Sequence, residues 1–251
     1  MRVALPAALC LALQVVPAGA GASGPAGVSD AEAARGECAL EAARRVQKHY
    51  ERIGDLRAHF LQTTQSVTLG GAASTALEAE GEVVFAKPGR MRWSYHRPQE
   101  SLVLSDGRVL WIYDPERKEA QRMEVTEAFM SGAAIQFLLG EGDLLEEFDI
   151  SSPDCAKQND PTKPSVRIGL ELIPRAPSHY ERLSIVVDSA SGAVHATTVI
   201  DLFGNRTQVE LRDVEMDQDP PDELFRFEPP DGVRVFDPSG TQDGRTPATT
   251  Q

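Results

Sequence analysis

The stretch FAKPGRMRWSYHRPQESLVLSDGRVLWIYD, from Phe85 to Asp114, decides the fold because apolar and polar residues alternate along it. Met91, Trp93 and Tyr95 fall on one face of a predicted strand, since side chains alternate with period two. The opposite face is polar and carries Arg90, Arg92, Ser94 and His96. This pattern is typical of a half-buried antiparallel strand, apolar on one side and polar on the other.

Two more strands are predicted in the same stretch. Leu102 and Leu104 continue the apolar pattern, and Ser105 to Arg108 forms a hairpin, because Asp-Gly tolerates positive φ. The following strand repeats the aromatic face with Val109, Trp111 and Tyr113. We therefore expect three adjacent strands that share one aromatic and aliphatic wall.

This predicted wall has two interpretations. The first is an ordinary core of a β-sandwich or barrel, which periodicity alone favours. The second is the lining of a ligand cavity. Both need the same apolar residues, so alternation does not separate them.

Outside this stretch the sequence predicts two helical segments and a series of short strands. Ser29 to Ile53 has apolar residues at helical spacing and is followed by Gly54, and Ser131 to Gly140 breaks the β pattern with a crowded apolar run. Strands are expected at 56–60, 77–85, 119–125, 166–173, 183–188, 194–201, 207–214 and 225–227. Such spacing indicates a meander, so we expect a mostly β protein, an incomplete antiparallel β-barrel of about ten or eleven strands with helices across its open face.

The first residues are typical of a secretory signal peptide. A basic start at Arg2 precedes an apolar run from Val3 to Val16 and small residues up to Ala22, so residues 1–22 are expected to be removed. Residues 23–236 then form one domain, and the polar tail 237–251 is expected to be disordered. The net charge of −13 argues against nucleic acid and anionic lipid surfaces as main partners.

Two cysteines remain after cleavage, Cys38 and Cys155. An exported compartment permits a disulfide between them, and two unpaired buried thiols are the alternative. Their spacing matches no zinc pattern, so no metal site is predicted.

The sequence contains no recognisable catalytic constellation. It has five histidines and none of them lies in a zincin-type spacing, and it has no G-x-S-x-G elbow or glycine-rich phosphate loop. We therefore expect a binding protein without a cofactor rather than an enzyme.

Four blocks of sequence resemble the LolA-type outer-membrane lipoprotein carriers. They are KPGRMRWSY, LSDGRVLWIYDP, DLFGNRTQVEL at 201–211 and PDELFRFEPPDGVRVFD at 221–237. The family's F-x-Q motif at the start of the mature protein corresponds to Phe60 and Gln62. The order and spacing of these blocks extend over most of the mature chain.

The resemblance implies a function and its partners. Family members are periplasmic carriers that collect triacylated lipoproteins from an inner-membrane ABC transporter and pass them to an outer-membrane receptor. The chain is then expected to be a monomer that shields acyl chains in a hydrophobic cavity. A carrier of another lipid or an envelope-stress sensor would share this cavity, and a structural β-protein with a packed interior remains a third interpretation.

The resemblance also assigns roles to residues. By this resemblance, residues 131–140 form a helical lid over the cavity. A helix that closes the end of a β-sandwich would have the same number of apolar residues and is the alternative. The residues expected to bind acyl chains are Phe60, Phe85, Met91, Trp93, Tyr95, Leu104, Trp111, Ile135, Phe137 and Leu138. Lys87 stands where the family commonly has an arginine that holds the lid. We expect Lys87 to latch the lid through backbone carbonyls near Phe137 to Gly140, the alternative being an exposed turn lysine.

Overall fold

The computed structural model describes residues 30–67, 76–125, 142–155 and 167–237, with side chains from Gly36 onward in the first helix. The predicted signal peptide, the helical segment at 131–140 and the polar tail after Asp237 lie outside these residues, so those predictions stay as they are. Among the described residues, no helix combines the length and the apolar character needed to cross a bilayer.

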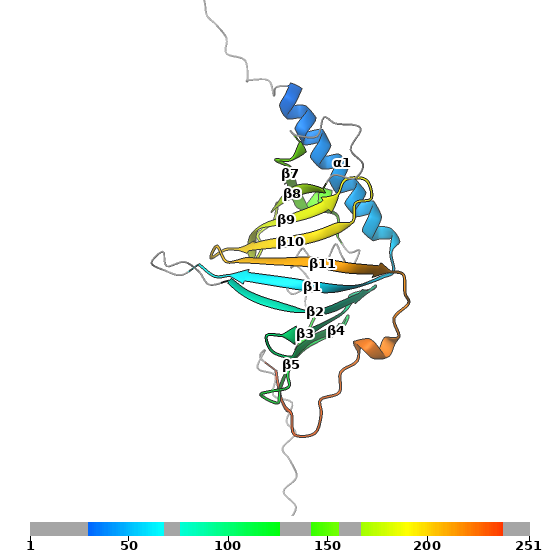
Figure 1. Ribbon diagram of the computed structural model, residues 1–251, viewed down its shortest axis with the longest axis vertical. Coiled ribbons are helices and arrows are strands. Elements are labelled where there is room, and N and C mark those ends of the chain that lie inside the picture. Colours follow the sequence, from blue (N-terminus) through cyan, green and yellow to red (C-terminus); the bar gives the residue numbers. More distant parts are fainter. Residues whose placement is uncertain (1–29, 68–75, 126–141, 156–166, 238–251) are drawn as a thin grey trace, which may run out of the picture.

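The described residues form one long helix and one large sheet (Figure 1). Helix α1 spans Asp30–Arg52, one residue inside each end of its predicted range. The first half of the chain then forms β1 Asp55–Gln65, β2 Ala76–Ala86, β3 Arg90–Arg97, β4 Ser101–Asp106, β5 Val109–Asp114 and β6 Glu119–Glu124. The second half forms α4 Leu144–Glu147, β7 Phe148–Ser151, β8 Arg167–Pro174, β9 Tyr180–Asp188, β10 Val194–Asp201, β11 Arg206–Met216, the 3-10 helix η2 Asp222–Phe225 and β12 Arg234–Phe236.

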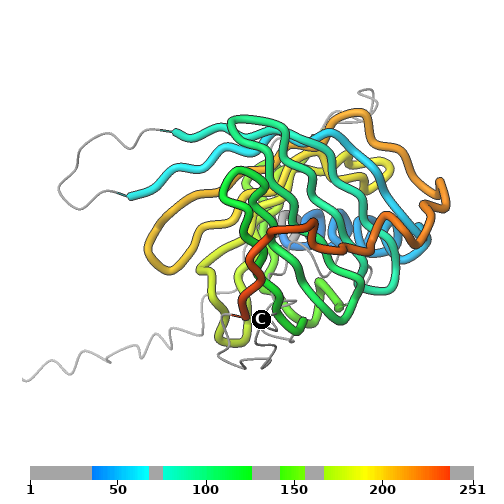
Figure 2. The backbone as a smooth tube through the Cα atoms, turned by 90° about the horizontal axis from the view of Figure 1, so that it is seen from below, coloured from blue at the N-terminus to red at the C-terminus, as the bar shows by residue number. Residues whose placement is uncertain are grey.

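The twelve strands lie in the order β12-β6-β5-β4-β3-β2-β1-β11-β10-β9-β8-β7. Two antiparallel meanders, β2 to β6 and β7 to β11, are therefore joined through β1, which pairs with both β2 and β11. The sheet ends at β7 on one side and at β12 on the other, and it does not close. The expectation of an incomplete, mostly β barrel is confirmed. In the view along the long axis the strands curve around α1 (Figure 2).

Two details of the predicted strands are wrong. Phe225 was expected in a last strand with Phe227, but it ends the 3-10 helix η2 and is buried against Val84 and Ala86 of β2. Prolines precede and follow this short helix in the sequence, and proline cannot donate to a sheet ladder. The last strand is instead β12, which pairs with β6 in parallel, so the sheet is not purely antiparallel.

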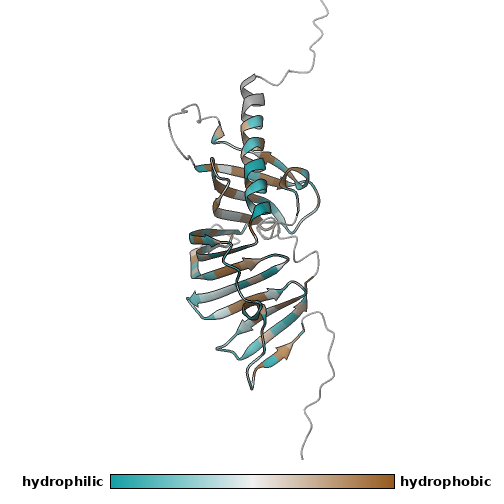
Figure 3. Cartoon of the chain, turned by 90° about the vertical axis from the view of Figure 1, so that its right-hand side faces the viewer, coloured by the Kyte–Doolittle hydropathy of each residue, from teal (hydrophilic) through white to brown (hydrophobic). Residues whose placement is uncertain are grey.

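Helix α1 covers the β7 to β10 part of the sheet and completes the main hydrophobic core. Its buried face consists of Ala39, Ala42, Ala43, Val46 and Tyr50. These residues pack on fully or almost fully buried strand residues, namely Ile168, Leu170 and Leu172 of β8 and Leu183, Ile185 and Val187 of β9. In Figure 3 hydrophobic and hydrophilic residues alternate along many of the strands, the pattern expected when successive side chains point to opposite faces of a sheet.

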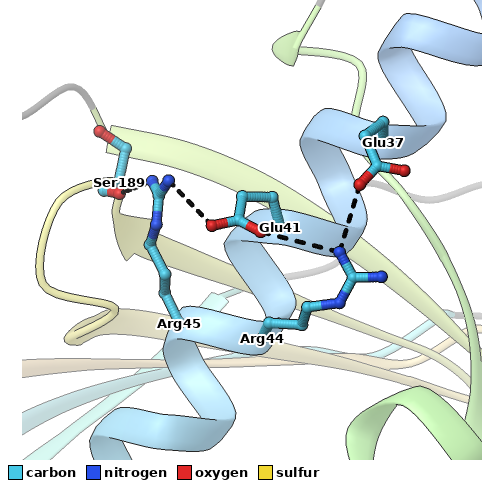
Figure 4. A network of polar contacts seen from close by, with 5 residues as sticks. All are labelled: Glu37, Glu41, Arg44, Arg45 and Ser189. Carbon is cyan, nitrogen blue, oxygen red and sulfur yellow. Dashed lines mark hydrogen bonds and ion pairs between the residues drawn. The ribbon is translucent and has the colours of Figure 1, made fainter.

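Several covalent and polar contacts hold α1 on this part of the sheet. The predicted disulfide is confirmed: Cys38 of α1 is joined to Cys155, which follows β7, with Cα atoms 5.9 Å apart. Arg45 donates from Nη1 to the backbone carbonyl of Ser189 at 2.6 Å and from Nη2 to Glu41 at 3.1 Å (Figure 4). The buried hydroxyl of Tyr50 accepts a hydrogen bond from the backbone N–H of Val194 at 3.1 Å.

Candidate ligand-binding face

Five of the predicted site residues come together on the inner face of β1, β2 and β3. The ring of Phe60 lies edge-on to Trp93 and Tyr95, with centroids 4.9 and 5.0 Å apart, and Phe85 lies edge-on to Trp93 at 5.6 Å. This geometry is the one that aromatic quadrupoles favour. We call this set, completed by the buried Met91, the aromatic wall: Phe60, Phe85, Met91, Trp93 and Tyr95.

A glycine allows the rings to approach one another. Gly81 of β2 lies directly between Phe60 of β1 and Tyr95 of β3 in the sheet register. A Cβ at this position would lie 1.9 Å from the backbone oxygen of Ser94 and 3.0 Å from the ring of Phe60. Any larger residue would therefore force β2 and β3 apart and separate the two aromatic rings.

The F-x-Q motif gains a physical explanation from this arrangement. Phe60 supplies the central ring of the aromatic wall, and Gln62, two residues further along β1, accepts a hydrogen bond from the hydroxyl of Tyr95 at 3.0 Å. Burial raises the pKa of Tyr95, so the hydroxyl stays protonated and can donate. Both motif residues therefore fix the position of Tyr95.

The wall continues across β4, β5 and β6. Val103, Ile112 and Met123 are partly buried and pack against the same cluster as Trp93. The sequence prediction did not include these three residues. The register would have identified them, because Trp93 pairs with Val103 and Val103 pairs with Ile112, and directly paired residues share a face.

Leu104 and Trp111 were expected on the aromatic wall, and the structure places them on the opposite face. Tyr95 pairs with Ser101, so Leu104 pairs with Arg92 on the polar side of β3, and Trp111 pairs with Leu104. The length of the connection between β3 and β4 fixes this register, and a one-residue difference moves every side chain to the other face. The alternation within each strand was predicted correctly. The register between β3 and β4, which decides which residues of β4 and β5 share a face with Trp93, was predicted wrongly.

The opposite face is covered by the C-terminal segment. The ring of Trp111 packs on Phe227 with centroids 5.2 Å apart, and Arg90 lies over the buried ring of Phe225 at 5.0 Å. Arg92 donates to the backbone carbonyl of Leu224 at 3.1 Å, and burial lowers its pKa. Arg90 and Arg92 therefore hold the segment after β11 on the outside of the sheet.

Lys87 binds the C-terminal end of helix α1, a contact that the sequence prediction did not include. Its ammonium donates to the backbone carbonyls of Tyr50 at 2.7 Å and Glu51 at 3.1 Å. Desolvation lowers the pKa of Lys87, and the nearby carboxylates of Glu51 and Asp217 partly oppose this shift. The expected acceptors at 137–140, like Ile135, Phe137 and Leu138, lie outside the described residues.

Within the described ranges, no three His, Cys, Asp or Glu side chains gather in a way that could hold a metal ion. Within the aromatic wall Phe60, Phe85 and Met91 are buried, so its accessible apolar surface comes from Trp93 and Tyr95, and the Tyr95 hydroxyl donates to Gln62. Such a face can bury an apolar ligand.

The fold and the wall together define a class of proteins: incomplete β-barrels whose inner apolar face is only partly covered. The family described as "Outer membrane lipoprotein carrier protein LolA" matches residues 52–228, and the chain belongs to this family. This range begins at the end of α1 and includes every strand from β1 to β11.

Two relatives in sequence agree with this assignment. An outer-membrane lipoprotein carrier protein of Bordetella avium is 34% identical over 176 residues, which are 68% of this chain and 77% of that protein. One from Halorhodospira halophila is 31% identical over 182 residues, 70% of this chain and 80% of that protein. The solved structure of a LolA superfamily protein from Nitrosomonas europaea is 11% identical, with a TM-score of 0.41 over 75% of this chain and 97% of that one.

Proposed function

We propose that the chain is a periplasmic carrier that binds the acyl chains of lipoproteins on the aromatic wall and moves them from the inner to the outer membrane. The observation that carries the proposal is the wall itself: Trp93 and Tyr95 stay half-exposed although they adjoin the main core. Each buried methylene contributes about 0.8 kcal/mol, so acyl chains in water strongly favour such a face.

The family supports the rest of the proposal. The relatives from Bordetella avium and Halorhodospira halophila are outer-membrane lipoprotein carrier proteins. The range that matches the family, residues 52–228, includes the wall strands β1 to β3. The proposed cargo is a triacylated lipoprotein, supplied by an inner-membrane ABC transporter and received at the outer membrane. The proposed action is binding and release without a chemical step.

The expected lid at 131–140 and its latch at Lys87 remain part of this proposal. Two of the three N–H groups of the Lys87 ammonium bind α1. The latch to the lid would use the third. A carbonyl near residues 137–140 would then meet the same ammonium that holds the end of α1, and lid position would depend on one charged side chain.

The test uses the two tryptophans, which lie on opposite faces of the sheet. A fluorescent or quenching acyl probe should change the emission of Trp93 and leave that of Trp111 unchanged. The Trp93→Phe variant should lose the response, and the Trp111→Phe variant should keep it. A response that disappears with Trp111→Phe would place the ligand on the outer face and contradict the proposal.

Mass spectrometry of the protein purified from the periplasm identifies the cargo. Copurified lipoproteins with three acyl chains support the carrier. A different lipid at the same face would support a carrier of that lipid, and a ligand-free protein that gives no Trp93 response would support a structural role.

A further inference from the structure

One end of the sheet carries exposed apolar side chains that belong neither to the core nor to the aromatic wall. Phe203 is 84% exposed, Leu77 67%, Leu202 64% and Val67 62%. These four residues, which we call the apolar tip, lie at the ends of β1 and β2 and in the turn between β10 and β11. Figures 1 and 2 show both hairpins projecting from the same side of the molecule.

The turn that displays Leu202 and Phe203 is held by a network of hydrogen bonds. The carboxylate of Asp201 accepts from the backbone N–H of Phe203 and of Asn205, both at 2.9 Å, and from the side-chain amide of Asn205 at 2.7 Å. These bonds fix the backbone with both apolar side chains outward. Their exposure is therefore a property of the folded turn.

The two hairpins are joined into one surface. The side-chain oxygen of Asn205 accepts from the backbone N–H of Val67 at 2.9 Å. Gly204 has φ +86°, and a Cβ there would lie 3.3 Å from a methyl carbon of Val67. Asn205 thus stabilises its own turn and also holds the end of β1 beside it.

The charge around the tip is unlike that of the whole chain. The sequence has no charged residue between Gln65 and Glu78, and none between Asp201 and Arg206. The chain as a whole carries a net charge of −13. The flanking charges, Asp201 and Arg206, are of opposite sign and lie at the base of the turn, so the tip itself adds no charge and contact through it would be driven by apolar burial.

The size and shape of the tip also restrict what binds to it. Among the described residues the tip consists of four side chains, a smaller patch than the roughly 800 Å² per partner that a stable protein interface buries. A bilayer accepts projecting apolar side chains without a matching groove, and aromatic side chains favour its interface. We propose that the apolar tip docks on the surface of a neutral lipid bilayer, with Leu202 and Phe203 entering the boundary between headgroups and acyl chains.

Docking by the tip does not depend on the proposed carrier function, so vesicles without cargo test it. The purified mature chain is mixed with vesicles of pure phosphatidylcholine and separated by flotation. We expect a bound fraction that high salt leaves unchanged, because no ion pairs are involved. The double variant Leu202→Ser and Phe203→Ser should lower the partition coefficient at least about tenfold, since two large side chains lose their apolar burial.

The matched control changes exposed apolar residues elsewhere on the chain. Ile173 is 50% exposed on β8 and Val235 is 45% exposed on β12. The double variant Ile173→Ser and Val235→Ser should float like the wild type. Equal flotation of the tip variant and the wild type would overturn the proposal. Binding that requires phosphatidylglycerol and disappears in high salt would also overturn it. So would sedimentation that shows a dimer for the wild type and the control variant but a monomer for the tip variant.

A second readout keeps the proposal testable if the double variant folds poorly. Phe203→Trp places a fluorophore at the tip, and brominated phosphatidylcholine should quench it on binding. Ile173→Trp provides the control and should not be quenched. Quenching of both variants, or of neither, would contradict docking through the tip.

Discussion

The part of the sheet under α1 and the part that bears the aromatic wall have the same alternation of residues but different burial. On β8 and β9 the inward residues Leu170, Leu172, Leu183 and Ile185 have no exposed surface. On β3 and β5 the inward residues Met91 and Leu110 are buried too, whereas Trp93, Tyr95 and Ile112, further along the same face, are only partly buried. Alternation therefore determines which face is apolar, whereas the covering element determines whether that face is a core or a binding surface.

The attachment of α1 explains the difference. The disulfide fixes α1 beside β7, Arg45 fixes its middle to the end of β9, and Tyr50 fixes its last turns to β10. Gly192, in the turn after β9, has a positive φ of +79°, and a Cβ there would lie 2.4 Å from the carbonyl oxygen of Arg45. Helix α1 thus packs closely on the β7 to β11 meander and does not cover the β2 to β6 meander in the same way.

The largest expected effect comes from releasing the first part of α1. The double variant Cys38→Ser and Cys155→Ser removes a crosslink between residues 117 positions apart. On the chain-entropy model this costs about 4–5 kcal/mol of unfolding free energy. Denaturant titration at neutral pH measures it. A loss below about 1 kcal/mol would mean that packing and the Arg45 contact alone hold the helix.

A matched pair of isoleucines compares the two regions directly. Ile185→Ala removes a fully buried side chain under α1 and should cost about 2–5 kcal/mol. Ile112→Ala makes the same change on the partly buried wall and should cost about 1 kcal/mol, because water already reaches that face. Denaturant titration of both variants gives the two values. Equal losses would show that the wall is as well packed as the core.

The fold was predictable from the sequence because its strands are strongly amphipathic. Trp93 and Tyr95 mark β3, Leu183 to Val187 mark β9, and the predicted range of β10 agrees with the structure at both ends. The disulfide also followed from simple counting of cysteines. What failed was the last strand, because the burial of Phe225 under Arg90 depends on a contact across the sheet that local pattern does not contain.

The site was predictable only in part, for a related reason. Phe60, Phe85 and Trp93 were identified correctly as neighbours, whereas Trp111 lies on the opposite face. An aromatic residue at every second position shows that a strand has one aromatic face. It does not show whether that face points toward the inside or the outside of the sheet. The register between β3 and β4 decides that, and three connecting residues fix it.

Alkaline pH offers a smaller effect that is largest in the covered region. Burial raises the pKa of Tyr50 to about 12 from an ordinary value near 10. The unfolded tyrosine loses its proton first, so the contribution of Tyr50 is complete below pH 10 and is lost as the pH rises toward 12. At about 1.4 kcal/mol per pKa unit, the loss is roughly 2–3 kcal/mol.

Unfolding titrations of wild type and Tyr50→Phe across this pH range isolate the effect. The variant should be less stable at neutral pH, because the N–H of Val194 loses its acceptor, but its alkaline decline should be shallower. Burial also raises the pKa of Tyr95 on the wall, so Tyr95→Phe should flatten the decline as well, but by less than Tyr50→Phe. Parallel curves for wild type and Tyr50→Phe would show that other groups cause the alkaline loss.

The smallest expected effect lies at Lys87, which connects the two regions. It occupies the turn between β2 and β3, beside the aromatic wall, and its ammonium binds the carbonyls of Tyr50 and Glu51 at the end of α1. Charged donors are favoured at a helix C-terminus, where unpaired carbonyls carry partial negative charge. Because the side chain is half-buried, losing both bonds in Lys87→Met should lower the free energy of unfolding by only about 1–2 kcal/mol. Lys87→Arg keeps the charge and adds donors, so its stability should stay close to that of the wild type.

Denaturant titration measures the stability of both Lys87 variants, and transfer of a fluorescent acyl probe to acceptor vesicles measures release. If Lys87 also holds the proposed lid, Lys87→Met should release the probe faster than its small loss of stability explains, and Lys87→Arg should release it no faster than the wild type. Equal release by all three proteins would limit Lys87 to joining α1 with the β2–β3 turn.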